Sequence, residues 1–138
     1  MARVSVEVPA ELVARVRETV LLLYEATAES LHLALRAHSE GRGSPSELHE
    51  HRMRLAQLDG LLTQLGWPAG GEPRGLELSG PAELLHDALY GTLIDAGERL
   101  AVTATSAWRG ELPLERVQEA AAEVLVLHRL LRRLESLT

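Results

Sequence analysis

Four amino acids are missing from this chain of 138 residues: cysteine, phenylalanine, lysine and asparagine. Without cysteine, the chain has no disulfides, thiolate metal sites or cysteine nucleophiles. Aromatic residues make up only 3% of the sequence. The core must therefore be built from leucine, valine and alanine, a composition that favours helices packed on helices.

Long apolar runs and an excess of positive charge are also missing. The longest uncharged segment near the middle, residues 100–108, is far too short to span a bilayer, and the first residues hold no apolar run typical of a signal peptide. The formal net charge of −6 at pH 7 argues against a general affinity for phosphate backbones. We expect one soluble cytoplasmic domain with no membrane segment. It is long enough to bury a core that needs no disulfides or metal ions to be stable.

Four Pro-x-Glu signals predict the starts of four helices. Proline suits the first helical position because its φ is fixed and it has no N–H to donate, and a glutamate in the first turn meets the positive end of the helix dipole. At the second start, Ser44 and Glu47 form a capping box. Glycines and prolines delimit predicted helices at residues 9–39, 44–65, 81–108 and 113–137.

Two short stretches, residues 4–8 and 76–78, alternate apolar and polar residues as a strand with one buried face does. Each precedes the sequence Pro-Ala-Glu-Leu, so the order strand–helix–helix occurs twice, over residues 1–66 and 74–138. Internal duplication and a chance match of leucine-rich helices both stay open. Short connections make each helix pair an antiparallel hairpin, so we expect the first and third helices to run parallel and the strands to pair as a ribbon.

These patterns predict an all-α fold: an up-and-down four-helix bundle with one or two very short β-strands. The third helix has a face of small residues that includes Gly91 and Gly97. Because each mid-helix glycine costs about 1 kcal/mol relative to alanine, we expect a neighbouring helix backbone to pack closely along this face. On that expectation, Gly97→Leu would overpack the contact.

The strand followed by Pro-Ala-Glu-Leu, over residues 3–20, resembles the opening of a ribbon–helix–helix DNA-binding protein. In that family, paired strands from a dimer enter the major groove. The chain departs from the family pattern because its first helix continues unbroken to Ser39 instead of turning early. Glu7 would also face the phosphates from the outer side of the strand, which is unfavourable. A DNA-binding regulator therefore stays the alternative function. We do not expect a nucleic-acid partner.

Two Glu-x-x-His pairs, Glu29 with His32 and Glu83 with His86, have the spacing that ferritin-like di-iron bundles use on one helix face. Glu29 lies roughly 30 Å along the first helix at 1.5 Å per residue, whereas Glu83 lies at the start of the third. The pairs would be at opposite ends of the bundle, which leaves Glu29 and His32 as weak metal candidates. We predict no metal ion or cofactor, and the sequence contains no Gly-x-Ser-x-Gly or phosphate-binding loop.

Apolar residues on the first and fourth helices extend beyond the stripe that a bundle core can absorb. A monomer would expose them as a contiguous patch of the kind that marks an interface. We therefore expect a homodimer that acts as a non-enzymatic protein–protein interaction module. A metal- or small-ligand-binding four-helix bundle is the remaining alternative. The predicted interface residues are Leu21, Leu22, Tyr24, Leu125, Val126 and Leu130.

Overall fold

The computed structural model describes residues 3–67 and 74–138. It bears out an all-α fold of four helices with a small two-stranded antiparallel sheet. In chain order the elements are strand β1 (Arg3–Val8), helix α1 (Ala10–Ser39), helix α2 (Pro45–Gln64), strand β2 (Leu76–Pro81), helix α3 (Ala82–Trp108) and helix α4 (Leu114–Ser136).

The helices begin and end at the predicted signals. Prolines occupy the N-caps of α1, α3 and α4, and at α2 the hydroxyl of Ser44 accepts a hydrogen bond of 3.2 Å from the backbone N–H of Glu47. Gly41 and Gly110 follow α1 and α3 with φ of +79° and +77°. Only glycine adopts this left-handed conformation without strain, so these residues end the two longest helices.

The two strands pair as the expected ribbon, with Val6 opposite Leu78 and Glu7 opposite Glu77. Val6 and Leu78 point into the core, while Glu7 and Glu77 are exposed. The ribbon therefore has one apolar face, which covers the start of the helical core, and one polar face toward solvent.

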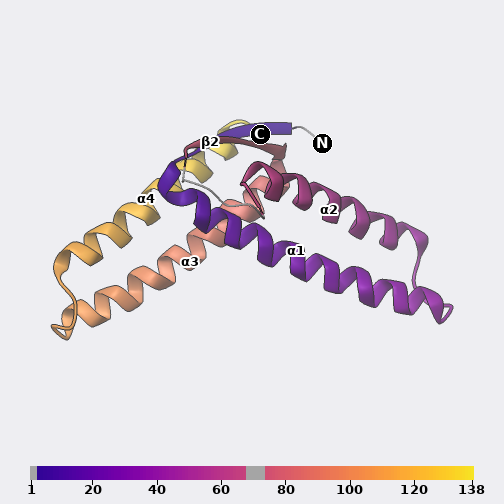
Figure 1. Cartoon of the computed structure of the whole chain (residues 1–138), viewed down its shortest axis with the longest axis horizontal. Helices are drawn as coiled ribbons and strands as arrows, with labels where there is room; N and C mark the ends of the chain where they lie inside the picture. The colour runs from indigo at the N-terminus through magenta and orange to yellow at the C-terminus, as the bar shows by residue number, and fades with distance from the viewer. Residues whose placement is uncertain (1–2, 68–73) are drawn as a thin grey trace.

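Figure 1 shows how the helices leave this ribbon: α1 with α2 and α3 with α4 form two antiparallel hairpins that spread apart as two arms. The expected parallel course of α1 and α3 is wrong, because these helices cross near the ribbon and then point to opposite sides (Figure 1). The strands explain this geometry. They run antiparallel and each continues directly into a helix, so the two helices set out in different directions.

The core lies where the two hairpins meet beneath the ribbon. Further out, each arm consists of two helices only, so apolar residues there, such as Leu48 and Ala121, are half-buried or exposed. The largest fully buried side chains are Leu12, Leu58, Leu61, Leu65, Leu78, Leu85, Leu89, Leu127, Leu134, Val8, Val16 and Val20.

The small-residue face of α3 splits into two parts with different surroundings. At Gly91 an added Cβ would lie 2.7 Å from Cγ2 of Thr19 on α1, which is the expected close contact between helices. At Gly97 an added Cβ would meet nothing within 4 Å. The expected overpacking by Gly97→Leu is therefore wrong for a single chain, because α1 has already diverged from α3 at this level.

The two halves of the chain repeat one geometry. Val6 pairs with Leu78 and Thr19 contacts Gly91, and in both pairs the partners are 72 positions apart. An approximate twofold axis therefore passes through the ribbon and through the helix crossing. The buried leucines of α2 and α4 correspond with a shift of 69 positions, because α1 is three residues longer than α3: they are Leu58, Leu61, Leu62 and Leu65 on α2, and Leu127, Leu130, Leu131 and Leu134 on α4.

Candidate functional site

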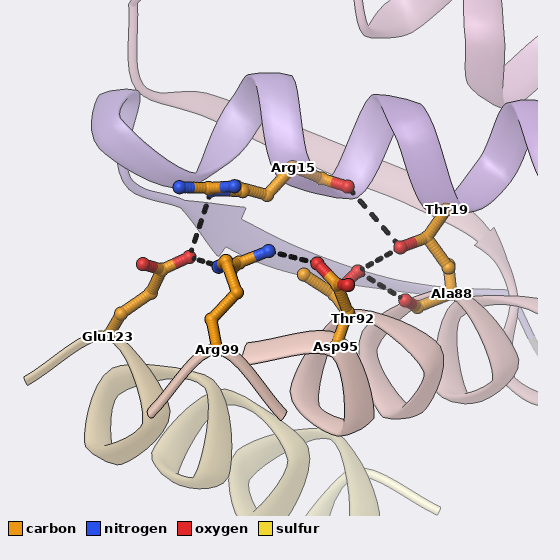
Figure 2. A network of polar contacts seen from close by, with 7 residues as sticks. All are labelled: Arg15, Thr19, Ala88, Thr92, Asp95, Arg99 and Glu123. Atoms are coloured by element: carbon orange, nitrogen blue, oxygen red, sulfur yellow. Dashed lines mark hydrogen bonds and ion pairs between the residues drawn. The ribbon is translucent and has the colours of Figure 1, made fainter. Parts of the chain in front are cut away.

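A polar network joins the hairpins where α1 passes over α3 and α4 (Figure 2). The carboxylate of Glu123 lies 3.2 Å from Nε of Arg15 and accepts a hydrogen bond of 2.6 Å from Arg99. Arg99 also pairs with Asp95 one turn earlier on α3. The carboxylate of Glu123 on α4 thus binds one arginine from α1 and one from α3.

Two threonines lie on the buried side of the crossing between α1 and α3. Thr92 is fully buried, and its hydroxyl is joined to that of Thr19 by a hydrogen bond of 2.8 Å (Figure 2). Each hydroxyl also lies within hydrogen-bond distance of a backbone carbonyl one turn earlier, Ala88 for Thr92 and Arg15 for Thr19. Because these hydroxyls are engaged with each other and with backbone, the network acts as a clamp between helices and has no free nucleophile.

A hollow of about 230 Å³ adjoins this clamp and is lined by Arg15, Arg99 and Arg116 together with Glu119 and Glu123. Three guanidinium groups in one hollow are the kind of arrangement that binds anions. Here, however, Glu123 already pairs with two of the three. Glu119 and Glu123 offset two of the three positive charges of the lining, and for Arg116 the described residues show no ion pair.

A larger hollow of about 480 Å³ lies between the start of α3 and the end of α4. Its wall includes His86, which stacks on Tyr90 with ring centroids 5.8 Å apart and lies 3.8 Å from the carboxylate of Glu135. Asp87 in the same wall pairs with Arg54 of α2 at 3.2 Å. His86 and Asp87 of this hollow thus have partners on neighbouring helices.

The weak metal candidates do not converge. Glu29 and His32 are exposed on the outer part of α1, whereas Glu83 and His86 lie at the start of α3, near the ribbon. Among residues 3–67 and 74–138, no group of three or more histidine, aspartate or glutamate side chains is placed to hold a metal ion. Each Glu-x-x-His pair therefore supplies two possible ligands at its own position on the helix. A di-metal site needs further ligands beside them.

The outer face of the ribbon is polar, as predicted for Glu7. Arg3, Ser5 and Glu7 are exposed on β1, and Glu7 lies directly opposite Glu77 of β2. Both strands come from one chain, whereas the ribbon–helix–helix pattern pairs strands from two chains. Two facing carboxylates repel phosphates, so this surface is unsuited to the major groove.

The six predicted interface residues have different surroundings in a single chain. Leu130 is only 8% exposed and belongs to the core, because the ribbon and α3 cover that face of α4. Leu21, Tyr24 and Val126 are half-buried against the core. Leu22 and Leu125 are the exposed members, at 66% and 47%.

A further exposed apolar surface, not predicted from the sequence, lies on the outer face of α3. We call it the α3 ridge. Two signals mark it in the sequence: the uncharged segment 100–108, which is too short to span a bilayer, and the mid-helix Gly97, for which the sequence predicts a close helix contact. The members of the α3 ridge are Tyr90, Ile94, Gly97, Ala101, Ala104 and Trp108.

Across the part of the chain that the structure describes, none of the helices has the length and apolar character needed to cross a membrane. No protein-family model, curated protein or solved structure matches the chain.

Proposed function

We propose that this protein is a non-enzymatic, self-associating helical module of the cytoplasm, which forms a homodimer and engages a further protein. One observation carries the proposal: large apolar side chains are exposed along both arms. Val102 and Leu114 are 67% and 66% exposed on one arm, Leu22 is 66% exposed at the root of the other, and Trp108 is 91% exposed. Contiguous exposed apolar patches mark interaction sites in soluble proteins, and we propose that these exposed side chains form such patches on their own arms.

These side chains are exposed in a single chain because each arm consists of two helices. Beyond the core, α1 packs on α2 and α3 packs on α4, and in the part of the chain that the structure describes no third helix closes either pair. Burying one leucine contributes roughly 1.5–3 kcal/mol, so several such residues per chain suffice for a stable dimer after the cost of association. A twofold contact would use the same surface on both copies.

The polar groups support a role in binding and not in catalysis. Within residues 3–67 and 74–138, no buried side-chain nitrogen or oxygen lacks a hydrogen-bond partner. The threonines and charged residues at the helix crossing are engaged in holding helices together. Acid–base or nucleophilic catalysis requires instead a nucleophile and a base that face a substrate.

Analytical ultracentrifugation at micromolar concentration tests the proposal. We expect a species of twice the 15.1 kDa chain mass. A wild-type protein that sediments as a 15.1 kDa monomer across the micromolar range would contradict self-association. Leu22→Glu and Leu125→Glu then test the patch predicted from the sequence, because both residues are exposed and their substitution spares the core.

Two further measurements test the rival functions. We expect no shift of duplex DNA at low salt, since the net charge is −6 and the ribbon presents Glu7 and Glu77 outward. We also expect no stoichiometric iron, manganese or zinc in protein purified from rich medium. A DNA shift would favour the regulator, and bound metal would favour the ligand-binding bundle, for which Glu29 and His32 would be the first residues to substitute.

A further inference from the structure

Two ion pairs join the hairpins, and the approximate twofold axis relates them with their charges reversed. Arg15 of α1 lies 3.2 Å from Glu123 of α4 (Figure 2), and Asp87 of α3 lies 3.2 Å from Arg54 of α2. Position 87 corresponds to position 15 with the shift of 72, and position 123 corresponds to position 54 with the shift of 69. The first half of the chain therefore contributes two arginines to the crossing, and the second half contributes two carboxylates.

This distribution of charge distinguishes between the possible pairings of the halves. If the first half of one chain paired with the first half of another in the same geometry, Arg15 would face Arg54 twice. Two second halves would place Asp87 opposite Glu123 twice. Both arrangements replace two attractions by two repulsions. Arg99 belongs to the same hairpin as Glu123 and would stay beside it in either case, so only the partner from the other hairpin changes.

Side-chain size on the axis makes the same distinction. Thr19 and Gly91 occupy corresponding positions and contact each other, and a Cβ at position 91 would lie 2.7 Å from Cγ2 of Thr19. Two first halves would bring a threonine to both sides of the axis at this distance. Two second halves would have glycine on both sides, and the buried hydroxyl of Thr92 would lose the hydrogen bond that joins it to Thr19. A close fit needs one threonine and one glycine.

The apolar core cannot make this distinction, because its residues are alike in the two halves. Leu58 of α2 corresponds to Leu127 of α4, and Leu12 of α1 corresponds to Leu84 of α3; all four are buried. Core packing alone would accept a like half as readily as an unlike one. The choice between pairings therefore depends on the two ion pairs and on the residues at the axis.

We propose that the crossing surface of each half is a docking surface that accepts the other half of this chain and rejects a copy of itself. A chain then closes on itself, and chains that exchange hairpins can join only a first half to a second half. The inference goes beyond the proposed function and does not rest on it. It implies that any contact between closed chains uses surfaces outside the crossing.

A thiol on the axis reports directly on the pairing of two first halves. Val6 lies opposite Leu78 in the ribbon, so in a pair of first halves position 6 of one chain would lie opposite position 6 of the other. Because the chain has no cysteine, Val6→Cys introduces a single thiol. Disulfides form only between thiols that face each other closely. The protein is refolded under reducing conditions and then oxidised, and a covalent species of twice 15.1 kDa measures this pairing.

Exchanging the charges of one ion pair should remove the discrimination. Arg54→Glu with Asp87→Arg, made together with Val6→Cys, keeps opposite charges across the crossing of a closed chain. Two first halves would now also place arginine opposite glutamate. We therefore expect a larger covalent fraction after refolding at high protein concentration than with Val6→Cys alone. Adding Thr19→Ser, which removes the crowding methyl group, should increase it further.

The matched control exchanges the same charges away from the crossing. Arg52→Glu with Asp59→Arg changes two exposed positions of α2 and keeps the same net charge. In the Val6→Cys background it should leave the covalent fraction unchanged. Circular dichroism checks that all variants keep their helices. If the folded Arg54→Glu, Asp87→Arg chain gives no more covalent species than this control, the inference is overturned.

Salt provides a second measurement, which does not need the charge-exchanged chain to fold. Raising the salt concentration from about 0.1 M to about 1 M shortens the Debye length from roughly 10 Å to roughly 3 Å. In the chain with Val6→Cys and Thr19→Ser, the covalent fraction should then rise, because screening weakens the repulsion between Arg15 and Arg54. An unchanged fraction would overturn the proposed role of the charges.

The thiol readout separates this inference from the proposed function. A wild type that sediments as a monomer contradicts self-association and supports closed chains. A wild-type dimer without covalent species in Val6→Cys supports both, since its contact lies outside the crossing. A high covalent fraction in Val6→Cys alone overturns the rejection of like halves and leaves self-association standing.

Discussion

Two glycines of α3, six positions apart, have opposite surroundings. Gly91 faces Thr19 where the two hairpins cross, and Gly97 faces solvent in a single chain. In the sequence, both glycines belong to the same face of small residues, which predicts close packing at each. Only the direction in which α1 leaves the crossing distinguishes a position that needs glycine for close packing from one that does not.

Gly91→Ala should destabilise the protein in spite of the better helix propensity of alanine. The new Cβ would lie 2.7 Å from Cγ2 of Thr19, so either the Thr19 side chain must rotate away from its hydrogen bond with Thr92 or one helix must shift. Overpacking of this kind costs about 1–3 kcal/mol, against a propensity gain of up to about 1 kcal/mol. Chemical denaturation of the variant measures the difference.

Two controls locate the cause of that loss. Thr19→Ser removes the clashing methyl group, so Gly91→Ala made in this background should cost less than in the wild type. Gly60→Ala, on the exposed side of α2 where an added Cβ meets nothing within 4 Å, should be neutral or stabilising. Equal effects of Gly91→Ala in both backgrounds would rule out the contact with Thr19 as the reason.

At the scale of the element, a side chain of α2 supplies the hydrogen bonds that a third strand would make. Gln64 donates from Nε2 to the carbonyl of Ser79 at 2.9 Å and accepts from the N–H of Ser79 at the same distance. A two-stranded sheet leaves one edge of each strand unpaired, and such edges invite pairing with other chains. Gln64 covers the edge of β2 at this residue and ties the ribbon to the first hairpin.

Gln64→Ala should therefore lower the free energy of unfolding by about 1–2 kcal/mol, since each hydrogen bond contributes about 0.5–1.5 kcal/mol net. Gln57→Ala is the matched control, a half-buried glutamine of the same helix for which the described residues show no side-chain hydrogen bond, and it should change stability by less than about 0.5 kcal/mol. Thermal unfolding of the two variants makes the comparison. If both lose stability equally, helix content and not the ribbon contact is responsible.

The elements themselves follow from local signals, and the sequence predicted them closely. The proline starts, the Ser44 capping box and the glycine ends place all four helices within one or two residues of their observed bounds. These signals act within a few residues of chain. Strand β2 is longer than predicted, from Leu76 to Pro81, because its pairing with β1 depends on residues far away in the sequence.

The candidate site was harder to predict for the same physical reason. Whether an apolar residue of a helix is covered depends on the path of the other hairpin. Leu130 belongs to the core because the ribbon lies against α4, whereas Trp108 is exposed because no helix follows the arm outward. The sequence contains more apolar residues than a core needs, and the interface predicted from it lay on α1 and α4. In a compact bundle, neighbouring helices would have covered α3.

At the scale of the whole molecule, stability should be concentrated where the hairpins meet. The core under the ribbon is shared by all four helices, and the clamp of Arg15, Arg99 and Glu123 ties α1 to α3 and α4 beside it. Each arm beyond this point has one helix contact instead of several. Segments with few buried apolar contacts open locally at a lower free-energy cost than the core.

Hydrogen exchange measured residue by residue should follow this division. We expect the slowest amides in residues 12–20, 58–65 and 84–92 around the shared core, and faster exchange in residues 28–39 at the end of the α1 arm. We expect the outer arm of α3 to exchange faster than the core as well, since it too has a single helix contact. If the arms exchange as slowly as the core, the hairpins do not open independently of it.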